Sequence, residues 1–198
     1  MTKFLFDLDG TITKQETLPL IAKAFGVEAI EGLTKETIAG NVPFVESFIR
    51  RVHLLKDLPV DEVSCLLGTV EIYPLLATFI RAHKEACGIV TGNLSCWIGL
   101  LVQKLGCACY ASEAVVENQR IQKLSAILRK ENVVQQLKEE GHRVIFIGDG
   151  NNDVEAMRIA DRSIAAALTH SPAAGVLSVA DYLVLNEVAL CRQLHQLL

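Results

Sequence analysis

The sequence has few aromatic residues, no long hydrophobic run and no excess of basic charge. Aromatic residues make up 6% of the 198 residues, so a chain that is 51% hydrophobic must build a mainly aliphatic core. No run approaches the ~18 apolar residues that a membrane-spanning helix needs, so no membrane association is expected. The formal net charge is -4. Without a basic stretch to contact the phosphate backbone, a nucleic-acid partner is not expected either.

The six cysteines also lack the spacing of a metal or redox site. No two of them form a C-x-x-C pair, and several interrupt apolar runs such as "EACGIV". Unpaired cysteines within apolar runs are usually small core residues of a protein kept in a reducing compartment. This cysteine usage predicts a cytoplasmic location. The chain carries no G-x-x-x-x-G-K-[ST] loop, no G-x-G-x-x-G fingerprint and no G-x-S-x-G elbow, so three common phosphate or hydrolase chemistries are excluded.

What the sequence does contain is an alternation of short apolar runs with amphipathic helical stretches. The apolar runs lie at 3–7, 86–91, 107–112, 143–149, 163–168 and 181–186. They are continuously apolar, as parallel strands covered on both faces should be. Helical patterns lie at 74–84, 94–105, 131–140, 153–160 and 187–197. This order predicts an α/β fold with a doubly wound parallel sheet.

Residues 15–72 break the alternation because they contain no convincing strand. Their pattern predicts helices at 17–25, around 34–39, at 43–56 and at 59–67, with Gly26 and Gly68 closing the first and the last. We therefore expect an α/β core made of 1–14 and 73–198. A helical cap, 15–72, is expected to cover the carboxyl edge of its sheet.

Polar residues stand at the ends of three predicted strands. The first strand ends in Asp7 and Asp9, the second in "TGN" (91–93), and the fourth in "GDGNND" (148–153). The carboxyl ends of parallel strands share one edge of a sheet, so four carboxylates should converge there: Asp7, Asp9, Asp149 and Asp153. Crowded carboxylates repel one another unless a cation neutralises them. Their hard oxygen atoms suit Mg²⁺ shared with a substrate phosphate.

Turns and a calcium loop account for these motifs less well. Asp and Asn are common in turns and at helix N-caps. To explain both acidic motifs in this way, however, such turns would have to occur at the ends of the first and the fourth predicted strands at once. A calcium loop starting at Asp149 would need Gly at its sixth position and Glu at its twelfth. The chain has Val154 and Ala160 there, so a calcium loop is excluded.

Two cations stand at unusual positions. Lys130 lies just before the helix predicted from 131, where a positive charge opposes the helix dipole unless an anion is bound; Lys123, the nearest alternative, is predicted to lie in an irregular stretch. Arg51 falls on the apolar face of the 43–56 helix together with Phe44. It either extends its charged end to water or binds an anion such as a carboxylate. Glu16 is either a surface residue or a group that faces the site.

The motifs "DLDGT", "TGN", Lys130 and "GDGNND" resemble, in order and spacing, the four motifs of haloacid dehalogenase-superfamily phosphatases. The resemblance covers essentially the whole chain. It implies that Asp7 attacks phosphorus to form an aspartyl-phosphate and that Asp9 transfers protons, with its backbone carbonyl facing Mg²⁺. The remaining roles that the resemblance implies are Mg²⁺ binding by Asp7, Asp149 and Asp153, and phosphate binding by Thr91, Gly92, Lys130 and Asn152.

Two cap segments, "QETLPLIAKAFGV" and "FIRRVHLLKDLPV", resemble those of phosphoserine phosphatases within that superfamily. This resemblance implies that Glu16 contacts a substrate ammonium and Arg51 a substrate carboxylate, with Phe44 and Asn93 beside them. The chain departs from that pattern at Gly10, where Ser is common, and at Asn93, where Gly is common.

These departures leave other substrates open, such as a sugar phosphate or a methionine-salvage intermediate, and also phosphotransfer to another acceptor. A receiver-like phosphate-binding module needs neither Asp9 nor a cap, so the sequence disfavours that class. A dehalogenase would not need Asp149 and Asp153 together with a proton donor at Asp9. The expected partner is a small phosphorylated metabolite, and the sequence is compatible with a monomer or a dimer.

Overall fold

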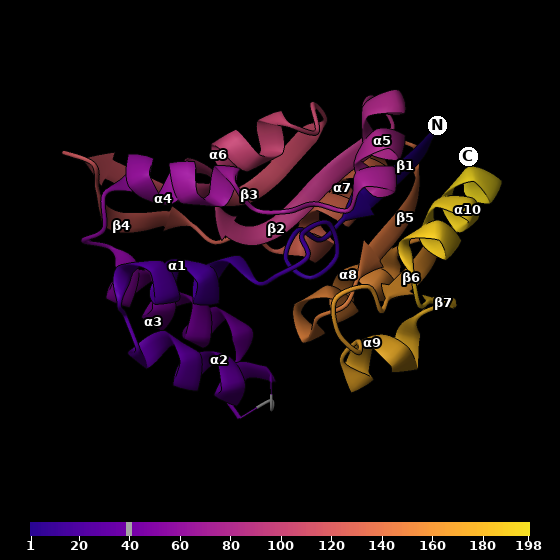
Figure 1. The fold of residues 1–198 in the computed structure, drawn as a ribbon. Helices are drawn as coiled ribbons and strands as arrows, with labels where there is room; N and C mark the ends of the chain where they lie inside the picture. Colours follow the sequence, from indigo (N-terminus) through magenta and orange to yellow (C-terminus); the bar gives the residue numbers. More distant parts are fainter. Residues whose placement is uncertain (39–40) are drawn as a thin grey trace.

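A seven-stranded sheet runs through the molecule in the computed structural model, which describes residues 1–38 and 41–198 (Figure 1). Its strands are β1 (Thr2–Phe6), β2 (Cys87–Leu94), β3 (Ala108–Glu117), β4 (Arg120–Ala126), β5 (Arg143–Gly148), β6 (Arg162–Ala166) and β7 (Tyr182–Val184). They lie in the order β4-β3-β2-β1-β5-β6-β7. Every neighbouring pair is parallel except β3 with β4. The predicted α/β class with a doubly wound sheet is confirmed.

Helices cover both faces of this sheet and form the inserted segment (Figure 1). They are α1 (Thr17–Phe25), α2 (Ala29–Ile38), α3 (Phe44–Leu55), α4 (Val60–Gly68), α5 (Pro74–Ala82), α6 (Ser95–Gln103), α7 (Lys130–Glu139), α8 (Val154–Ile159), α9 (Ala174–Val179) and α10 (Glu187–Leu197). A short 3₁₀ helix, η1 (Asn151–Asp153), precedes α8. The sequence did not predict β4 or α9.

The central strand, β1, shows how the sheet divides two cores. Phe4 and Phe6 point to one face and Leu5 to the other, because successive strand side chains alternate, and all three are buried. Burial of each side chain stabilises the fold by roughly 1.5–3 kcal/mol. β1 pairs with β2 on one side and β5 on the other. The polar ends of three adjacent strands therefore meet at one edge of the sheet.

The inserted helices leave and rejoin the sheet at one place. Thr13 and Ile72 form an antiparallel bridge, and the Lys14 amide donates to the Glu71 carbonyl at 3.0 Å. Helices α1, α2 and α3 form a group beyond the strand ends, whereas α4 packs beside α6 (Figure 1). The segment that follows β1 is thus anchored where the predicted site lies.

The segment after residue 112 is a hairpin, which corrects the prediction of an irregular stretch around Lys123. β3 continues to Glu117 and turns into β4, on which Lys123 lies. The turn is formed by Asn118 and Gln119, whose φ angles are 50 and 64 degrees. Hairpin turns with two positive φ angles usually contain glycine, which makes them recognisable in a sequence, and this turn has none. The Gln119 carbonyl accepts a hydrogen bond from Val60 N at 2.8 Å, so the hairpin tip holds the start of α4.

The helix ends follow the prediction in part. Gly26 ends α1 in the left-handed conformation at φ 70, as predicted. Gly68 is instead the last residue of α4, and the right-handed Thr69 caps it, so the prediction that Gly68 closes this helix was wrong. The predicted end at residue 39 of the middle helix lies outside the described residues. Within the described part of the chain, no helix is both long and apolar enough to cross a membrane.

All six cysteines are free. Cys87 is buried in the core, but Cys65 and Cys109 are exposed, so the expectation of core cysteines holds only in part. These thiols therefore act as small side chains rather than as cross-links.

Candidate active site

The predicted edge of the sheet does gather the predicted residues. Asp7 directly follows β1 and Asp149 directly follows β5, and these two strands are hydrogen-bonded neighbours. Thr91 and Asn93 lie inside the last part of β2, which extends to Leu94 rather than ending at 91. The site therefore sits where the strand order reverses, the position at which open α/β sheets bind ligands.

Three buried carboxylates form the centre of the site. Oxygen atoms of Asp7, Asp149 and Asp153 all lie within 4.8 Å of one another. Asp153 is fixed by its own loop, since its Oδ2 accepts the amides of Asp149 at 3.0 Å and Gly150 at 2.9 Å. A Cβ on Gly148 would overlap the Asp153 carboxylate, so only glycine fits before Asp149.

Lys130 is the cation that faces these carboxylates. It begins α7 and is 3% exposed, and its Nζ lies 2.6 Å from Asp7 Oδ1 and 2.6 Å from Asp153 Oδ1. The chain itself therefore places anions, Asp7 and Asp153, against this lysine. Three carboxylates and one ammonium leave an excess of two negative charges, which a divalent cation would balance.

The pKa values of these groups reflect burial and crowding. Burial, followed by the charge of Asp153, raises the pKa of Asp7 well above its usual range. The same two causes raise the pKa of Asp149 to about 7, although the Thr11 hydroxyl donates to its Oδ1 at 2.5 Å. Burial lowers the pKa of Lys130, but Asp153 and Asp7 outweigh it and raise that pKa above the usual range.

Asp9 lies apart from the three-carboxylate cluster and is attached to the inserted helices. Its Oδ1 accepts the backbone amide of Thr17, the first residue of α1, at 2.8 Å. Burial and then the charge of Glu16 raise the pKa of Asp9 to about 6, while hydrogen bonds from Thr17 lower it. A carboxyl group with this pKa exchanges protons readily near neutral pH.

Asn93 does not point freely toward a ligand. Its Nδ2 donates to Thr17 Oγ1 at 2.6 Å, and its Oδ1 accepts the Leu94 amide at 2.8 Å. Thr17 is therefore bonded to both Asp9 and Asn93, so it links the ends of β1 and β2 to α1. The sequence prediction missed this threonine.

The predicted phosphate-binding residues are brought to the same edge by different means. The Thr91 hydroxyl is buried and accepts the Asn93 amide at 3.1 Å. Gly92 packs under Phe44 of α3, where a Cβ would lie only 2.7 Å from the ring. Asn152 lies on η1 with its amide oxygen against Gly150. That position, directly before Asp153, supports the β5 loop, and among the described residues no hydrogen bond joins the Asn152 side chain to Asp7, Asp149 or Lys130.

Arg51 is buried beside the site and has no ionic partner in the part of the chain that the structure describes. It is 6% exposed, its guanidinium lies 6.0 Å from the centre of the Phe44 ring, and its Nε donates weakly to Ser47 O at 3.4 Å. Within the described residues no carboxylate lies within 4.0 Å of it. Burial lowers the pKa of Arg51, while the charges of Asp9 and Glu16 raise it. The alternative that Arg51 extends into water was wrong.

His170 is a residue of the site that the sequence prediction missed. It lies between β6 and α9, with Nε2 3.3 Å from Glu16 Oε1 and 3.2 Å from Asp149 Oδ2. The hydrogen bond to Glu16 raises the pKa of His170 to about 9. Gly10, at φ 75, leaves room for the ring, because a Cβ there would lie 2.9 Å from His170 Nε2. The unusual glycine was the only sequence signal for this contact.

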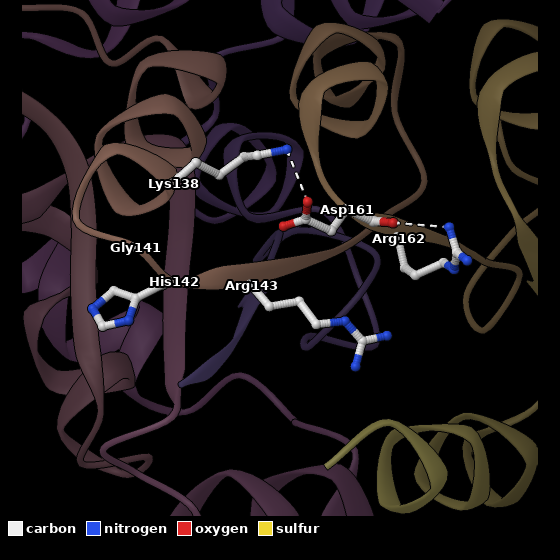
Figure 2. A pocket seen from close by; sticks show the side chains of 6 residues that line it. All are labelled: Lys138, Gly141, His142, Arg143, Asp161 and Arg162. Atoms are coloured by element: carbon white, nitrogen blue, oxygen red, sulfur yellow. Dashed lines mark hydrogen bonds and ion pairs between the residues drawn. The ribbon is translucent and has the colours of Figure 1, made fainter.

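A cavity of about 580 Å³ lies at the opposite end of the sheet (Figure 2). It is lined by Lys138, Gly141, His142, Arg143, Asp161 and Arg162, none of which is a predicted site residue. Figure 2 shows Lys138 pointing toward Asp161, with Nζ 3.0 Å from Oδ1. This cavity is at the amino ends of β5 and β6, so it has no part in the carboxylate site.

Comparisons with known proteins agree with this geometry. A family model described as haloacid dehalogenase-like hydrolase matches residues 2–161. A phosphoserine phosphatase of Methanocaldococcus jannaschii is 27% identical over 175 residues, covering 81% of this chain and 83% of that protein. One of Archaeoglobus fulgidus is 28% identical over 163 residues, but this chain spans only 47% of its length.

A solved structure of a phospho-aspartyl intermediate analogue of phosphoserine phosphatase superposes with a TM-score of 0.83 at 25% identity, covering 99% of both chains. The family match spans most of the chain, and it includes both strand ends that carry the buried carboxylates. The chain therefore belongs to the haloacid dehalogenase-like hydrolases.

Proposed function

We propose that this chain is a Mg²⁺-dependent phosphomonoester hydrolase that acts through an aspartyl-phosphate on a small substrate of the phosphoserine type. The α/β core (1–14 and 73–198) carries the chemistry and the helical cap (15–72) selects the substrate. One observation carries the proposal: on one side of the buried carboxylate cluster with Lys130 lies a buried Arg51 that has no ionic partner among the described residues. The six free cysteines support a cytoplasmic setting.

The donor set at the cluster fits Mg²⁺. The ligands on offer are carboxylate oxygens, and the excess of two negative charges matches a divalent ion. Asp7 and Asp149 would hold the ion, together with Asp153 directly or through a water molecule. The Asp153 carboxylate also fixes the loop, because its oxygens accept Lys130 and the loop amides. When bound, Mg²⁺ would reduce the repulsion between Asp7 and an anionic phosphate.

The reaction follows from the positions of two carboxylates. Asp7 Oδ1 accepts Lys130 and the Leu8 amide, which leaves Oδ2 without a partner among the described residues and free to attack phosphorus. The bond from phosphorus to the leaving oxygen breaks as Asp9 donates its proton to that oxygen. Asp9 then takes a proton from a water molecule that attacks the aspartyl-phosphate, and inorganic phosphate leaves as Asp7 is regenerated.

The surrounding groups stabilise the phosphoryl oxygens. The Thr91 hydroxyl, the Gly92 amide and the Lys130 ammonium are donors at the ends of β2 and α7, fixed before the reaction begins. Phe44 covers Gly92 and helps to exclude bulk water. The Asn93 amide is bonded to Thr17 rather than free to bind a sugar hydroxyl, so a sugar phosphate gains no support from it.

Arg51 and Glu16 select the rest of the substrate in this proposal. A planar guanidinium that is buried and unpaired is suited to a carboxylate bound through two hydrogen bonds. Glu16 lies on the same side of the site and is suited to an ammonium group. A small phosphorylated amino acid carries both groups.

The proposal is tested by comparing O-phospho-L-serine with p-nitrophenyl phosphate, which has no carboxylate. Arg51→Met should raise KM for phosphoserine by at least tenfold and leave the aryl phosphate within twofold. Arg50→Met is the matched control, because Arg50 is exposed and paired with Glu46 on the other side of α3. Equal effects of Arg51→Met on both substrates, or turnover by Asp7→Asn, would contradict the proposal.

A further inference from the structure

The two charged groups of the proposed substrate subsite are not equally available. Arg51 is buried and has no carboxylate within 4.0 Å among the described residues. Glu16 is already engaged, because His170 Nε2 lies 3.3 Å from its Oε1. A ligand carboxylate would therefore meet an unpaired cation, whereas a ligand ammonium would have to share or displace an existing partner.

The position of His170 is held from three sides. Its Nε2 also lies 3.2 Å from Asp149 Oδ2, and its Nδ1 lies 3.2 Å from the carbonyl oxygen of Ser171. The ring thus bridges Glu16, at the start of α1, and Asp149, at the end of β5. Any side chain at Gly10 would collide with the ring, since a Cβ there lies 2.9 Å from Nε2. Gly10 and His170 are therefore one arrangement rather than two separate features.

We propose that His170 is a positioning residue that, by engaging Glu16, removes the need for an ammonium group on the substrate. The substrate class is then small phosphate monoesters that carry a carboxylate, with or without an amine. This inference rests on the proposed function. Its physical reason is that a polar group which already has a partner gains little from a second one, whereas an unpaired buried charge gains much.

Three phosphate esters separate the two charges. O-phospho-L-serine carries both a carboxylate and an ammonium, 3-phosphooxypropionate carries only the carboxylate, and O-phosphoethanolamine carries only the ammonium. In the wild-type protein with Mg²⁺, we expect kcat/KM for the first two to agree within about tenfold and the third to be at least about tenfold lower. A site that demanded the ammonium would separate the first two by far more.

The His170→Ala variant tests the assigned role directly. With Glu16 released, the preference for phosphoserine over 3-phosphooxypropionate should rise at least about tenfold. The lost contact with Asp149 affects kcat for all three esters alike, so the ratio isolates the effect through Glu16. His170→Gln, which keeps an N–H donor, should give a smaller rise. His142→Ala is the control, because His142 lies at the opposite end of the sheet (Figure 2).

The outcomes separate this inference from the proposed function. If wild-type protein prefers phosphoserine over 3-phosphooxypropionate by more than tenfold, the inference is overturned whether or not the variants fold. It is also overturned if the ratio in both His170 variants stays within twofold of wild type, while the proposed function stands. If wild-type protein hydrolyses neither carboxylate ester faster than p-nitrophenyl phosphate, the proposed function fails and this inference fails with it.

Discussion

Replacing Lys130 by methionine should destabilise the metal-free protein by about 3–5 kcal/mol. Methionine keeps much of the apolar stem but removes the ammonium that lies 2.6 Å from both Asp7 and Asp153. Two buried carboxylates then lose their cation, and Asp149 lies within 4.8 Å of them. In the folding equilibrium this corresponds to a shift of roughly a hundredfold to a few thousandfold.

Urea unfolding in EDTA at about pH 8 and about pH 5 measures this effect and its sign. Without Lys130, the carboxyl groups hold protons in the folded state at pH values where the unfolded chain has released them. The folded variant therefore binds more protons than its unfolded form, and its stability falls as the pH rises. The loss relative to wild type should be large at pH 8 and smaller at pH 5. Mg²⁺ should restore part of it.

Lys138→Met is the matched control for this measurement. Lys138 lies on the same helix, α7, but its ion pair with Asp161 at 3.0 Å is partly exposed. Removing such a pair costs at most about 1 kcal/mol. If Lys130→Met and Lys138→Met lost similar stability at pH 8, or if the Lys130 effect did not change with pH, the charge-balance account of the cluster would be refuted.

Three further predictions follow from neighbouring contacts. Asp7→Asn should raise the free energy of unfolding of the metal-free protein by about 1–2 kcal/mol, measured in urea at neutral pH, because it removes a carboxylate whose pKa burial has raised. A loss of stability would contradict the claim that the crowded carboxylates destabilise the metal-free fold. Gly92→Ala should cost about 1–3 kcal/mol through collision with Phe44, and Phe44→Leu should recover about 1 kcal/mol or more of it in thermal unfolding of the double variant. Thr17→Val removes the side-chain hydrogen bond that lowers the pKa of Asp9 and keeps the one from the Thr17 backbone amide. The pKa of Asp9 should rise and move the alkaline limb of kcat/KM upward by about half a pH unit to one unit; an unchanged limb would mean that Asp9 is not the group that titrates there.

The parts of the fold that the sequence predicted are the continuous apolar runs of buried strands and the helices with a clear apolar face. The strand of Phe4 to Phe6 and the helix 187–197 were predicted because burial imposes a pattern on them. The β3–β4 hairpin was not predicted because Asn118 and Gln119 make its turn without glycine. Helix α9 was missed because its six residues, Ala174–Val179, include no charged side chain to mark a polar face, unlike the equally short α8.

The site divides in the same way. Asp7, Asp149 and Lys130 were predicted because each stands at the end or start of a recognisable element. His170 was not, because its contacts with Glu16 and Asp149 join segments distant in the chain and leave no pattern around the histidine itself. Thr17 was missed because it looks like an ordinary first helical residue. The local sequence pattern shows which residues are buried. It does not show which residues from distant segments meet at the edge of the sheet, because only the folded chain brings them together.

The two outer strands of the sheet, β4 and β7, are poorly suited to form a continuous sheet with the edge strands of other copies of this apolar chain. β7 is only three residues long, so it offers few free backbone groups to another strand. β4 is longer, but it exposes Arg120 and Lys123, and its pairing with β3 is interrupted by irregularities at two places. Charged, bulged borders are poor templates for strand addition. Resistance to aggregation should therefore be most sensitive to substitutions on β4 that replace these cations with apolar residues.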